Sequence, residues 1–257
     1  MYPYVVIGRY YIPSYYLCAL AGFLITFIVI SRILINKYLF GKYIKIYLYS
    51  FIGMGIGARI LGIISGLLYY HQVNGKWSLI SAINSSGIVF IGGLIGYIVN
   101  LFILCKIKRE SFLVASDIAS IGIPLFHSFG RIGCFLSGCC YGKLSDSKLA
   151  IPYRIYSQDI YMKRIPVQIY ESIFEFLMFI LMYFLFRNME RKNINNKNLI
   201  SIYILLYGIW RFFIEFYRGD EVRYVVKGIS ITQIIIVISI IIITLSTRRK
   251  NYNERKH

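Results

Sequence analysis

Long apolar runs dominate this sequence of 257 residues and constrain its fold more than any other feature. A transmembrane helix needs about 20 consecutive apolar residues, and about seven runs are that long. They lie near residues 15–36, 44–70, 87–105, 113–135, 169–187, 198–217 and 228–246. Hydrophobic residues make up 58% of the chain, more than a soluble domain of this size can bury. We expect an all-α, polytopic membrane protein in which residues 1–257 form a single integral membrane domain.

The positive charges between the runs predict how the chain crosses the membrane. A net charge of +18 suggests nucleic acid as a partner in a soluble protein. Here most cations lie in loops, where they determine topology and attract anionic headgroups, so we expect membrane lipids and no nucleic acid. Loops after the first, third and fifth runs, together with the C-terminal tail, hold fifteen cations against ten on the opposite side. This predicts an N-terminus outside and a C-terminus in the cytoplasm, with the longest loop, about 136–168, outside.

Three arginines, Arg59, Arg131 and Arg211, interrupt the apolar runs. A cation near the bilayer centre is unfavourable by roughly 2.5–3.5 kcal/mol, so it normally faces a polar cavity and binds an anion. Glu215 follows Arg211 by four residues, which places both on one helix face. The pair alone fits either an ion pair that lets the helix insert or the charged wall of a lipid pocket. The other buried arginines favour the pocket.

His127 and Arg131 show the same spacing in the fourth run, just before the segment GCFLSGCCYG at 133–142. We expect the helix to break into this segment, and irregular backbone at membrane depth must be surrounded by protein or by a water-filled cavity. Histidine accepts protons near neutral pH, so His127 is a candidate base. The alternative is a histidine bonded to a backbone carbonyl at the break. The neighbouring Arg131 favours the functional interpretation.

Cys134, Cys139 and Cys140 allow three interpretations. A metal site is the least favoured, because C-x4-C-C matches no familiar zinc spacing and adjacent cysteines rarely bind one ion together. A nucleophilic thiol near Arg131 is the second. Small packing residues at a tight turn, with or without a disulfide, are the most favoured, and we expect no metal and no cofactor.

Glu171 and Glu175 stand four residues apart at the start of the fifth run. The ordinary preference of helix N-termini for carboxylates explains Glu171. Glu175 lies deeper, where it needs a partner such as an arginine.

In their order and spacing, several motifs resemble those of the phosphatidylglycerol–prolipoprotein diacylglyceryl transferases. The signature-like segment is HSFGRIGCFLSGCCYG at 127–142. The supporting segments are SYYLCALAGF (14–23), GARI (57–60), GGLIG (92–96), IPVQIYES (165–172), YGIWRFFIEFYRGD (207–220) and SITQ (230–233). The resemblance therefore extends over nearly the whole chain.

The resemblance implies an enzyme of the bacterial cytoplasmic (inner) membrane. Such enzymes transfer a diacylglyceryl group from phosphatidylglycerol to the lipobox cysteine of exported preprolipoproteins, whose signal peptides are their partners. By this resemblance, Arg131, Arg211, Glu215 and Tyr15 are catalytic residues, and we expect His127 to substitute as the base for a histidine that the family usually has elsewhere. The substrate-binding residues are Arg59, Arg131, Arg211, Gly92, Gly93 and Gly142.

Three positions depart from the family pattern. Ile91 stands where a histidine is usual, Cys134 where an asparagine is usual and Cys139 where an acidic residue is usual. These departures leave open a divergent paralogue that binds or transfers lipid onto another acceptor, or a non-enzymatic lipid-binding membrane protein. A thiol-redox protein built on the cysteines is disfavoured because the chain has no C-x-x-C pair.

Overall fold

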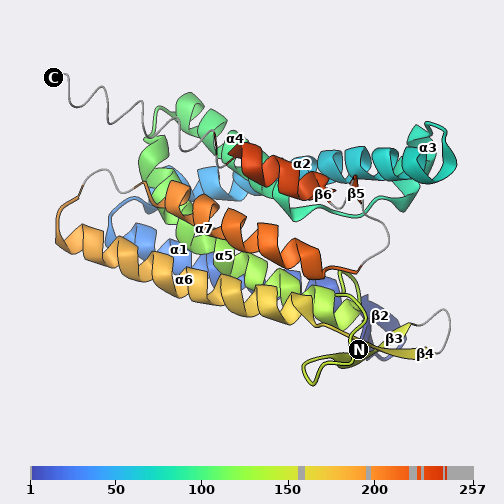
Figure 1. The fold of residues 1–257 in the computed structure, drawn as a ribbon. Coiled ribbons are helices and arrows are strands. Elements are labelled where there is room, and N and C mark those ends of the chain that lie inside the picture. The colour runs from blue at the N-terminus through green and yellow to red at the C-terminus, as the bar shows by residue number, and fades with distance from the viewer. Residues whose placement is uncertain are drawn as a thin grey trace. The chain divides into compact units, whose positions relative to one another are not determined.

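The computed structural model describes residues 2–155, 160–194, 198–219, 225–226, 229–239 and 241. The helices are α1 (Ser14–Asn36), α2 (Phe40–Asn74), α3 (Leu79–Ser85), α4 (Phe90–Lys108), α5 (Phe112–Ser137), α6 (Val167–Arg191) and α7 (Leu199–Ile214), followed by the 3-10 turn Glu215–Tyr217 (Figure 1). Residues 231–239 are also helical. Antiparallel pairs are formed by β1 (Tyr4–Ile7) with β2 (Tyr10–Pro13), β3 (Ile151–Ile155) with β4 (Ile160–Arg164), and β5 (Val225–Val226) with β6 (Ile229–Ser230).

Six helices of the described chain are long and apolar enough to cross a membrane. They are α1, α2, α4, α5, α6 and α7 extended to Tyr217, and they match the first six predicted runs. The predicted polytopic helical fold is therefore confirmed. Of the seventh predicted run, 228–246, only residues 229–239 and 241 lie within the described part. The predicted long loop at 136–168 contains the β3–β4 hairpin, which the hydropathy pattern did not reveal.

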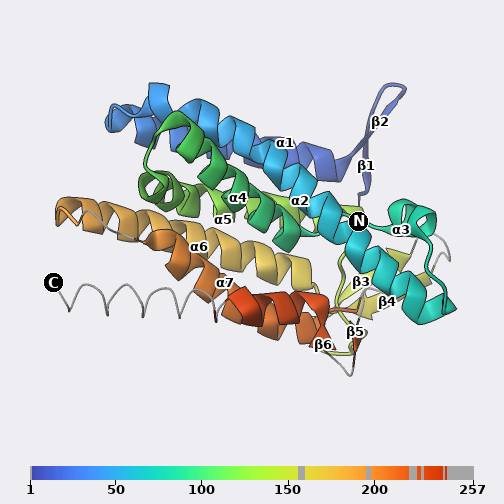
Figure 2. The same ribbon diagram turned by 90° about the horizontal axis from the view of Figure 1, so that it is seen from above.

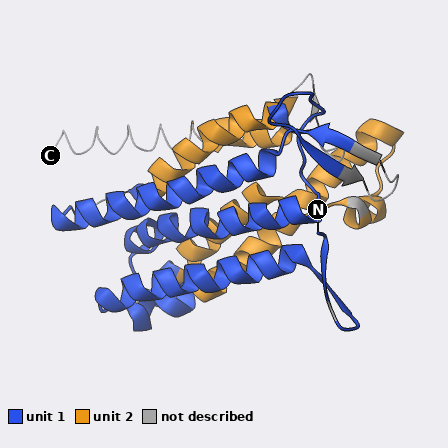
Figure 3. Ribbon diagram, turned by 90° about the horizontal axis from the view of Figure 1, so that it is seen from below, with its two compact units in different colours: residues 1–47, 105–199, 217–221 blue, residues 48–104, 200–216, 222–257 orange. Residues whose placement is uncertain are grey.

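The chain divides into two compact units, which are described separately (Figure 3). Unit 1 comprises residues 1–47, 105–199 and 217–221. Within it α5 packs against both α1 and α6, and the three helices run side by side (Figure 2). In the apolar stretch of α5, 72% of the residues are buried. In every other candidate span this share is 44% or less. This central position explains why α5 can carry polar side chains that lipid would not accept.

Small residues bring α1 and α5 close together. A Cβ atom on Gly22 would lie 2.6 Å from the Cβ of Phe129, and one on Gly122 would lie 2.6 Å from the Cδ1 of Ile30. Glycine at such contacts lets helix backbones approach closely in a membrane, where packing drives association. These two glycines are therefore explained by packing.

Helix α5 is longer and more regular than its sequence suggests. It continues through Pro124, with the hydroxyl groups of Ser120 and Ser128 donating to the carbonyls of Asp117 (2.6 Å) and Leu125 (2.7 Å). The predicted break does occur, but only at Gly138, whose φ of 74° gives the left-handed cap typical of glycine. His127 and Arg131 consequently lie within regular helix, and the irregular part of the signature-like segment is 138–142.

Unit 2 comprises residues 48–104, 200–216 and 222–257. The GIGARI and FIGGLIG segments pack α2 against α4 through glycines. A Cβ on Gly57 would collide with the carbonyl oxygen of Gly92, and one on Gly96 with that of Gly53. The side-chain amide of Asn100 adds a bond to the carbonyl of Tyr49 (2.9 Å). These glycines therefore let α2 and α4 pack with their backbones in close contact.

Candidate active site

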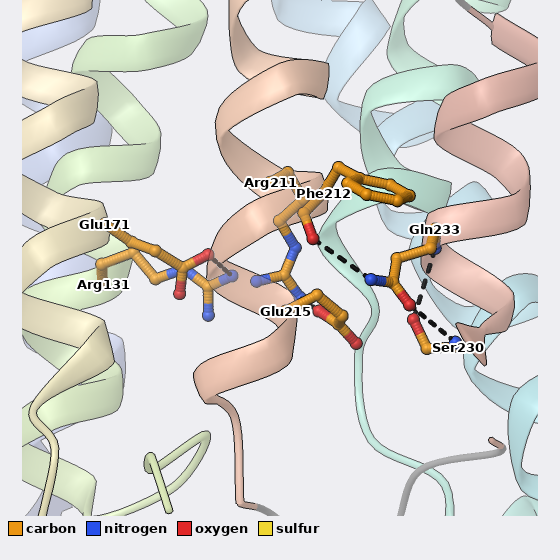
Figure 4. Close-up of polar contacts among 7 residues, drawn as sticks. All are labelled: Arg131, Glu171, Arg211, Phe212, Glu215, Ser230 and Gln233. Carbon is orange, nitrogen blue, oxygen red and sulfur yellow. Dashed lines mark hydrogen bonds and ion pairs between the residues drawn. The ribbon is translucent and has the colours of Figure 1, made fainter. Parts of the chain in front are cut away.

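The guanidinium group of Arg131 lies buried between α5 and α6 in unit 1. Its Nη2 is 3.1 Å from Oε1 of Glu171, and these side chains are 7% and 1% exposed (Figure 4). The Nε of Arg131 has no hydrogen-bond partner among the described residues. The helix-terminus explanation for Glu171 was therefore wrong, because this carboxylate is the counter-ion of Arg131. Glu171 engages Nη2, while the neighbouring Nε is still able to donate to a further anion.

His127 lies one helical turn before Arg131 and has its own acidic partner. Its Nδ1 is 3.0 Å from Oε1 of Glu175, and both side chains are almost completely buried. The arginine expected beside Glu175 is thus replaced by His127. Between the two pairs, the hydroxyl of Ser172 donates to the carbonyl of Ser128 (2.9 Å).

These contacts follow from two matched spacings. Four residues separate His127 from Arg131 on α5, and four separate Glu171 from Glu175 on α6. His127, the earlier residue on α5, meets Glu175, the later residue on α6, and Arg131 meets Glu171. The two helices therefore run antiparallel here. Residues four apart lie on one helix face, so a single interface brings both pairs together.

Tyr15, in the first turn of α1, lies beside the same part of α5. A Cβ on Gly133 would lie 3.2 Å from the Cα and the Cδ2 of Tyr15, and 3.1 Å from the Cβ of Cys18. The phenol of Tyr15 is close enough to Arg131 to interact with it electrostatically. The structure therefore places Tyr15 near Arg131, which lies one helical turn after His127.

The loop after α5 is fixed by backbone bonds on both sides. The N–H of Gly142 donates to the carbonyl of Ile165 (3.1 Å), and that of Gly219 donates to the carbonyl of Tyr141 (2.9 Å). Arg164 donates from Nη1 to the carbonyl of Gly142 (3.2 Å), and its guanidinium lies 4.2 Å from the ring centre of Tyr141. A Cβ on Gly142 would collide with the Ile165 carbonyl oxygen. The position therefore requires glycine for packing, while its predicted contact with substrate stays a prediction.

Gln168 ties the start of α6 to this loop. Its Nε2 donates to the carbonyl of Cys139 (2.6 Å), and its Oε1 accepts from the hydroxyl of Tyr153 (2.8 Å). Burial raises the pKa of Tyr153 to about 12, although the bond to Gln168 lowers it. The phenol thus stays neutral and can donate. Hydropathy did not indicate roles for Gln168, Tyr153 or Arg164, although Gln168 lies in the matched IPVQIYES segment.

Cys134, Cys139 and Cys140 converge at the end of α5 as free thiols. Their three sulfur atoms all lie within 4.8 Å of one another. Hydrogen bonds from Cys134 and Cys139 lower the pKa of Cys140 well below its ordinary value, with help from Arg218 and Arg131 and against the effect of burial. For Cys139 a hydrogen bond from Cys134 lowers the pKa, but the bond with Cys140 and burial together raise it to about 12.

In unit 2, Arg211 and Glu215 form the predicted i, i+4 ion pair. Nη2 of Arg211 lies 2.8 Å from Oε2 of Glu215, and the two side chains are 5% and 2% exposed (Figure 4). The helix α7 ends at Ile214, so Glu215 already belongs to the following 3-10 turn.

The SITQ segment supports this end of α7 by a capping arrangement. The hydroxyl of Ser230 accepts from the N–H of Gln233 (3.3 Å), while Oε1 of Gln233 accepts from the N–H of Ser230 (2.9 Å) (Figure 4). This reciprocal pair is a capping box at the start of the helical residues 231–239. Nε2 of Gln233 also donates to the carbonyl of Phe212 (3.1 Å), next to Arg211. The motif therefore holds the backbone beside the ion pair.

Arg59, also in unit 2, binds the backbone. Its Nη1 donates to the carbonyl of Ser86 (2.8 Å), and its Nη2 donates to that of Ile83 (2.7 Å). These carbonyls lie at the end of α3, where helices leave carbonyl groups unsatisfied. A structural role is thus evident for Arg59, and substrate binding stays a prediction for it and for Gly92 and Gly93.

Ile91, which stands where the resembled family usually has histidine, lines an apolar cavity of about 210 Å³ in unit 2. The other lining residues are Leu94, Ile95, Ile98, Ile204, Tyr207, Gly208, Ile236 and Ser239. The cavity is suited to hydrocarbon rather than to a charged headgroup.

Comparisons with known proteins agree with the motifs. The profile of the prolipoprotein diacylglyceryl transferase family matches residues 4–247. The chain is 36% identical over 197 residues to the phosphatidylglycerol–prolipoprotein diacylglyceryl transferase of Clostridium tetani, covering 74% of this chain and 76% of that protein. It is 31% identical over 253 residues to phosphatidylglycerol–prolipoprotein diacylglyceryl transferase 1 of Clostridium perfringens, covering 95% and 94%. With a profile match over nearly its whole length and relatives of matching length, the chain belongs to the prolipoprotein diacylglyceryl transferase family.

Proposed function

We propose that this protein transfers a diacylglyceryl group from phosphatidylglycerol to the lipobox cysteine of exported preprolipoproteins. Family membership supports the reaction class. The observation that carries the proposal is Arg131, a buried guanidinium held by Glu171 through Nη2 with Nε still able to donate. A phosphate diester is an anion that such a fork binds well.

The reaction requires a thiolate and a stabilised leaving group. The lipobox sulfur attacks the glyceryl carbon that bears the phosphate ester. The carbon–oxygen bond breaks, a thioether forms, and glycerol phosphate leaves with the bonding electron pair. Negative charge grows on the phosphate oxygens as the bond breaks, so a fixed arginine lowers the barrier most at that stage. This is the role proposed for Arg131.

His127 is the proposed acceptor of the thiol proton. A lipobox thiol has a free pKa near 8.5, so it needs a base or cationic surroundings to react at neutral pH. The carboxylate of Glu175 beside Nδ1 favours a proton on that nitrogen, which makes Nε2 the basic atom. It also stabilises the imidazolium that forms, as the acidic member of a catalytic triad does. Glu215 is the alternative base.

Arg211 and Glu215 are proposed as required residues on the strength of the family resemblance and their burial in unit 2. Tyr15 is proposed to act beside Arg131. The apolar cavity lined by Ile91 offers a place for hydrocarbon of the donor lipid. Isoleucine at position 91 then removes one polar group that the family usually has. The base is kept, because His127 serves as the base.

The same reasoning gives a location. We infer a bacterial cytoplasmic membrane, with the N-terminus outside, the C-terminus in the cytoplasm and the reaction near the outer face. Signal peptides of preprolipoproteins reach that face when they are exported.

The second candidate is a lipid-binding or divergent protein that holds phosphatidylglycerol without transferring it to a lipobox thiol. The departures at Ile91, Cys134 and Cys139 are what favour it. Complementation separates the two functions. In a bacterial strain depleted of its own transferase, this protein should restore growth, and mass spectrometry of a reporter lipoprotein should show one added diacylglyceryl group. Unmodified reporter in cells that contain the folded protein would favour the second candidate.

A further inference from the structure

The thiols of Cys134, Cys139 and Cys140 are arranged as a set of metal ligands, although their spacing in the sequence suggests none. All three sulfur atoms lie within 4.8 Å of one another. Three sulfurs that each bind one ion at about 2.3 Å are about 4 Å apart when they surround it in a plane. The observed separations need to shrink by less than one ångström to reach that geometry.

Two left-handed residues explain how adjacent cysteines point to one place. Gly138 ends α5 with φ of 74°, and Cys140 itself has φ of 56°, a conformation uncommon for residues with a side chain. The chain therefore reverses immediately after α5, so that Cys139 and Cys140 come back to Cys134. The turn is held in place by Gln168, whose amide binds the carbonyl of Cys139 (2.6 Å), and the Cys139 thiol contacts the carbonyl of Cys134 (3.7 Å).

The ligand set selects the kind of ion. The cluster contains three cysteines and, within the described part of the chain, no histidine or carboxylate. Zinc prefers four ligands in a tetrahedron, whereas soft thiolate donors suit Cu(I), which accepts three. We propose that Cys134, Cys139 and Cys140 form a three-thiolate site for Cu(I).

The surroundings match the charge of such a site. Three thiolates around one Cu(I) give a complex of charge −2. The guanidinium groups of Arg218 and Arg131 both lie close enough to Cys140 to act on its charge, so two cations offset the complex. Access is also suitable, because Cys139 is exposed and Cys140 is half-buried, while Cys134 is buried.

The test is a titration of the reduced, full-length protein in detergent, without oxygen, by Cu(I) in competition with a coloured Cu(I) chelator. The site predicts one ion per chain, and X-ray absorption should show sulfur neighbours only. Cys139→Ser, at the exposed position, should lower the affinity at least tenfold while leaving the melting temperature unchanged. Cys134→Ser and Cys140→Ser should have the same effect on affinity.

Cys18→Ser and Cys105→Ser are the matched controls, because these two free cysteines lie outside the cluster. Both variants should bind Cu(I) as the unmodified protein does. The proposal is overturned by a stoichiometry below one, by equal affinity in all five variants, or by nitrogen or oxygen neighbours at the ion. Preferential binding of Zn(II) over Cu(I), or formation of a disulfide in place of a complex, would also overturn it. None of these measurements uses transferase activity, so the result is independent of the proposed function.

Discussion

Arg131 and Glu171 form a buried ion pair between α5 and α6, with Nη2 3.1 Å from Oε1. A cation in the interior of a membrane protein needs a counter-ion, and Glu171 supplies it from a fixed helix. The guanidinium is thereby oriented, and its Nε has no hydrogen-bond partner among the described residues. In the proposed reaction, this arginine is oriented for the donor phosphate before the substrate arrives.

Arg131→Lys should show whether catalysis needs the planar guanidinium group of Arg131 or only its positive charge. Lysine keeps the positive charge but cannot donate from two nitrogens in one plane, so we expect kcat/KM to fall roughly 100-fold. Arg187→Lys, at an exposed position of α6, is the control and should change neither activity nor yield. Full activity of Arg131→Lys in a lipobox-peptide assay would show that a point charge suffices.

The pair of His127 and Glu175 should behave as one unit. General base catalysis contributes roughly 10²–10⁴ to the rate, so His127→Gln should lower kcat by that order. Glu175→Gln should lower it less, because the histidine remains. If Glu175 acts only through His127, the double variant should be no slower than His127→Gln alone. Additive losses measured by the same lipidation kinetics would mean that the two residues act independently.

Gly142 and Gly130 provide a steric comparison within one motif. A methyl group on Gly142 would collide with the carbonyl of Ile165, whereas one on Gly130 meets no described atom within 4 Å. Gly142→Ala should therefore lower the melting temperature and the yield of folded protein. Gly130→Ala should leave both unchanged, as measured by fluorescence-detected chromatography after heating. Equal stability of the two variants would show that the loop adapts to a side chain.

The raised pKa of Tyr153 predicts that the stability of the fold depends on pH. Its pKa is raised from about 10 to about 12, so the folded state holds the phenolic proton more tightly than the unfolded state does. This contribution to stability is fully present below pH 10 and is lost as the pH rises through 12. The melting temperature of the unmodified protein should thus fall more steeply above pH 10 than that of Tyr153→Phe. Parallel curves would contradict the raised pKa.

Much of the fold could be predicted from the sequence, because membrane helices are encoded by local hydropathy. Six predicted runs coincide with long helices, and the Arg211–Glu215 pair follows directly from its spacing within one helix. The end of α5 was harder to predict. The glycine-rich segment 133–142 suggested a break, but the helix continues to Ser137, since packing between α1 and α6 supports it.

The partners of the buried charges were not predictable in the same way. Glu171 had an adequate local explanation at a helix start, and nothing local joins it to Arg131, 40 residues away. Glu175 was expected to meet an arginine and meets His127 instead. Both outcomes depend on the antiparallel register of α5 and α6, which one sequence does not encode locally. The cysteine turn is similar, because the left-handed conformation of Cys140 could not be foreseen from the spacing.

The most direct test uses the purified protein in phosphatidylglycerol vesicles with a synthetic lipobox peptide. Thioether-linked peptide and released glycerol phosphate should appear in equal amounts. A peptide with serine in place of the lipobox cysteine should give neither product, and Arg131→Ala should lower both at least 100-fold. Undiminished lipidation by folded Arg131→Ala, or phosphatidylglycerol binding with no release of glycerol phosphate by the unmodified protein, would contradict the account.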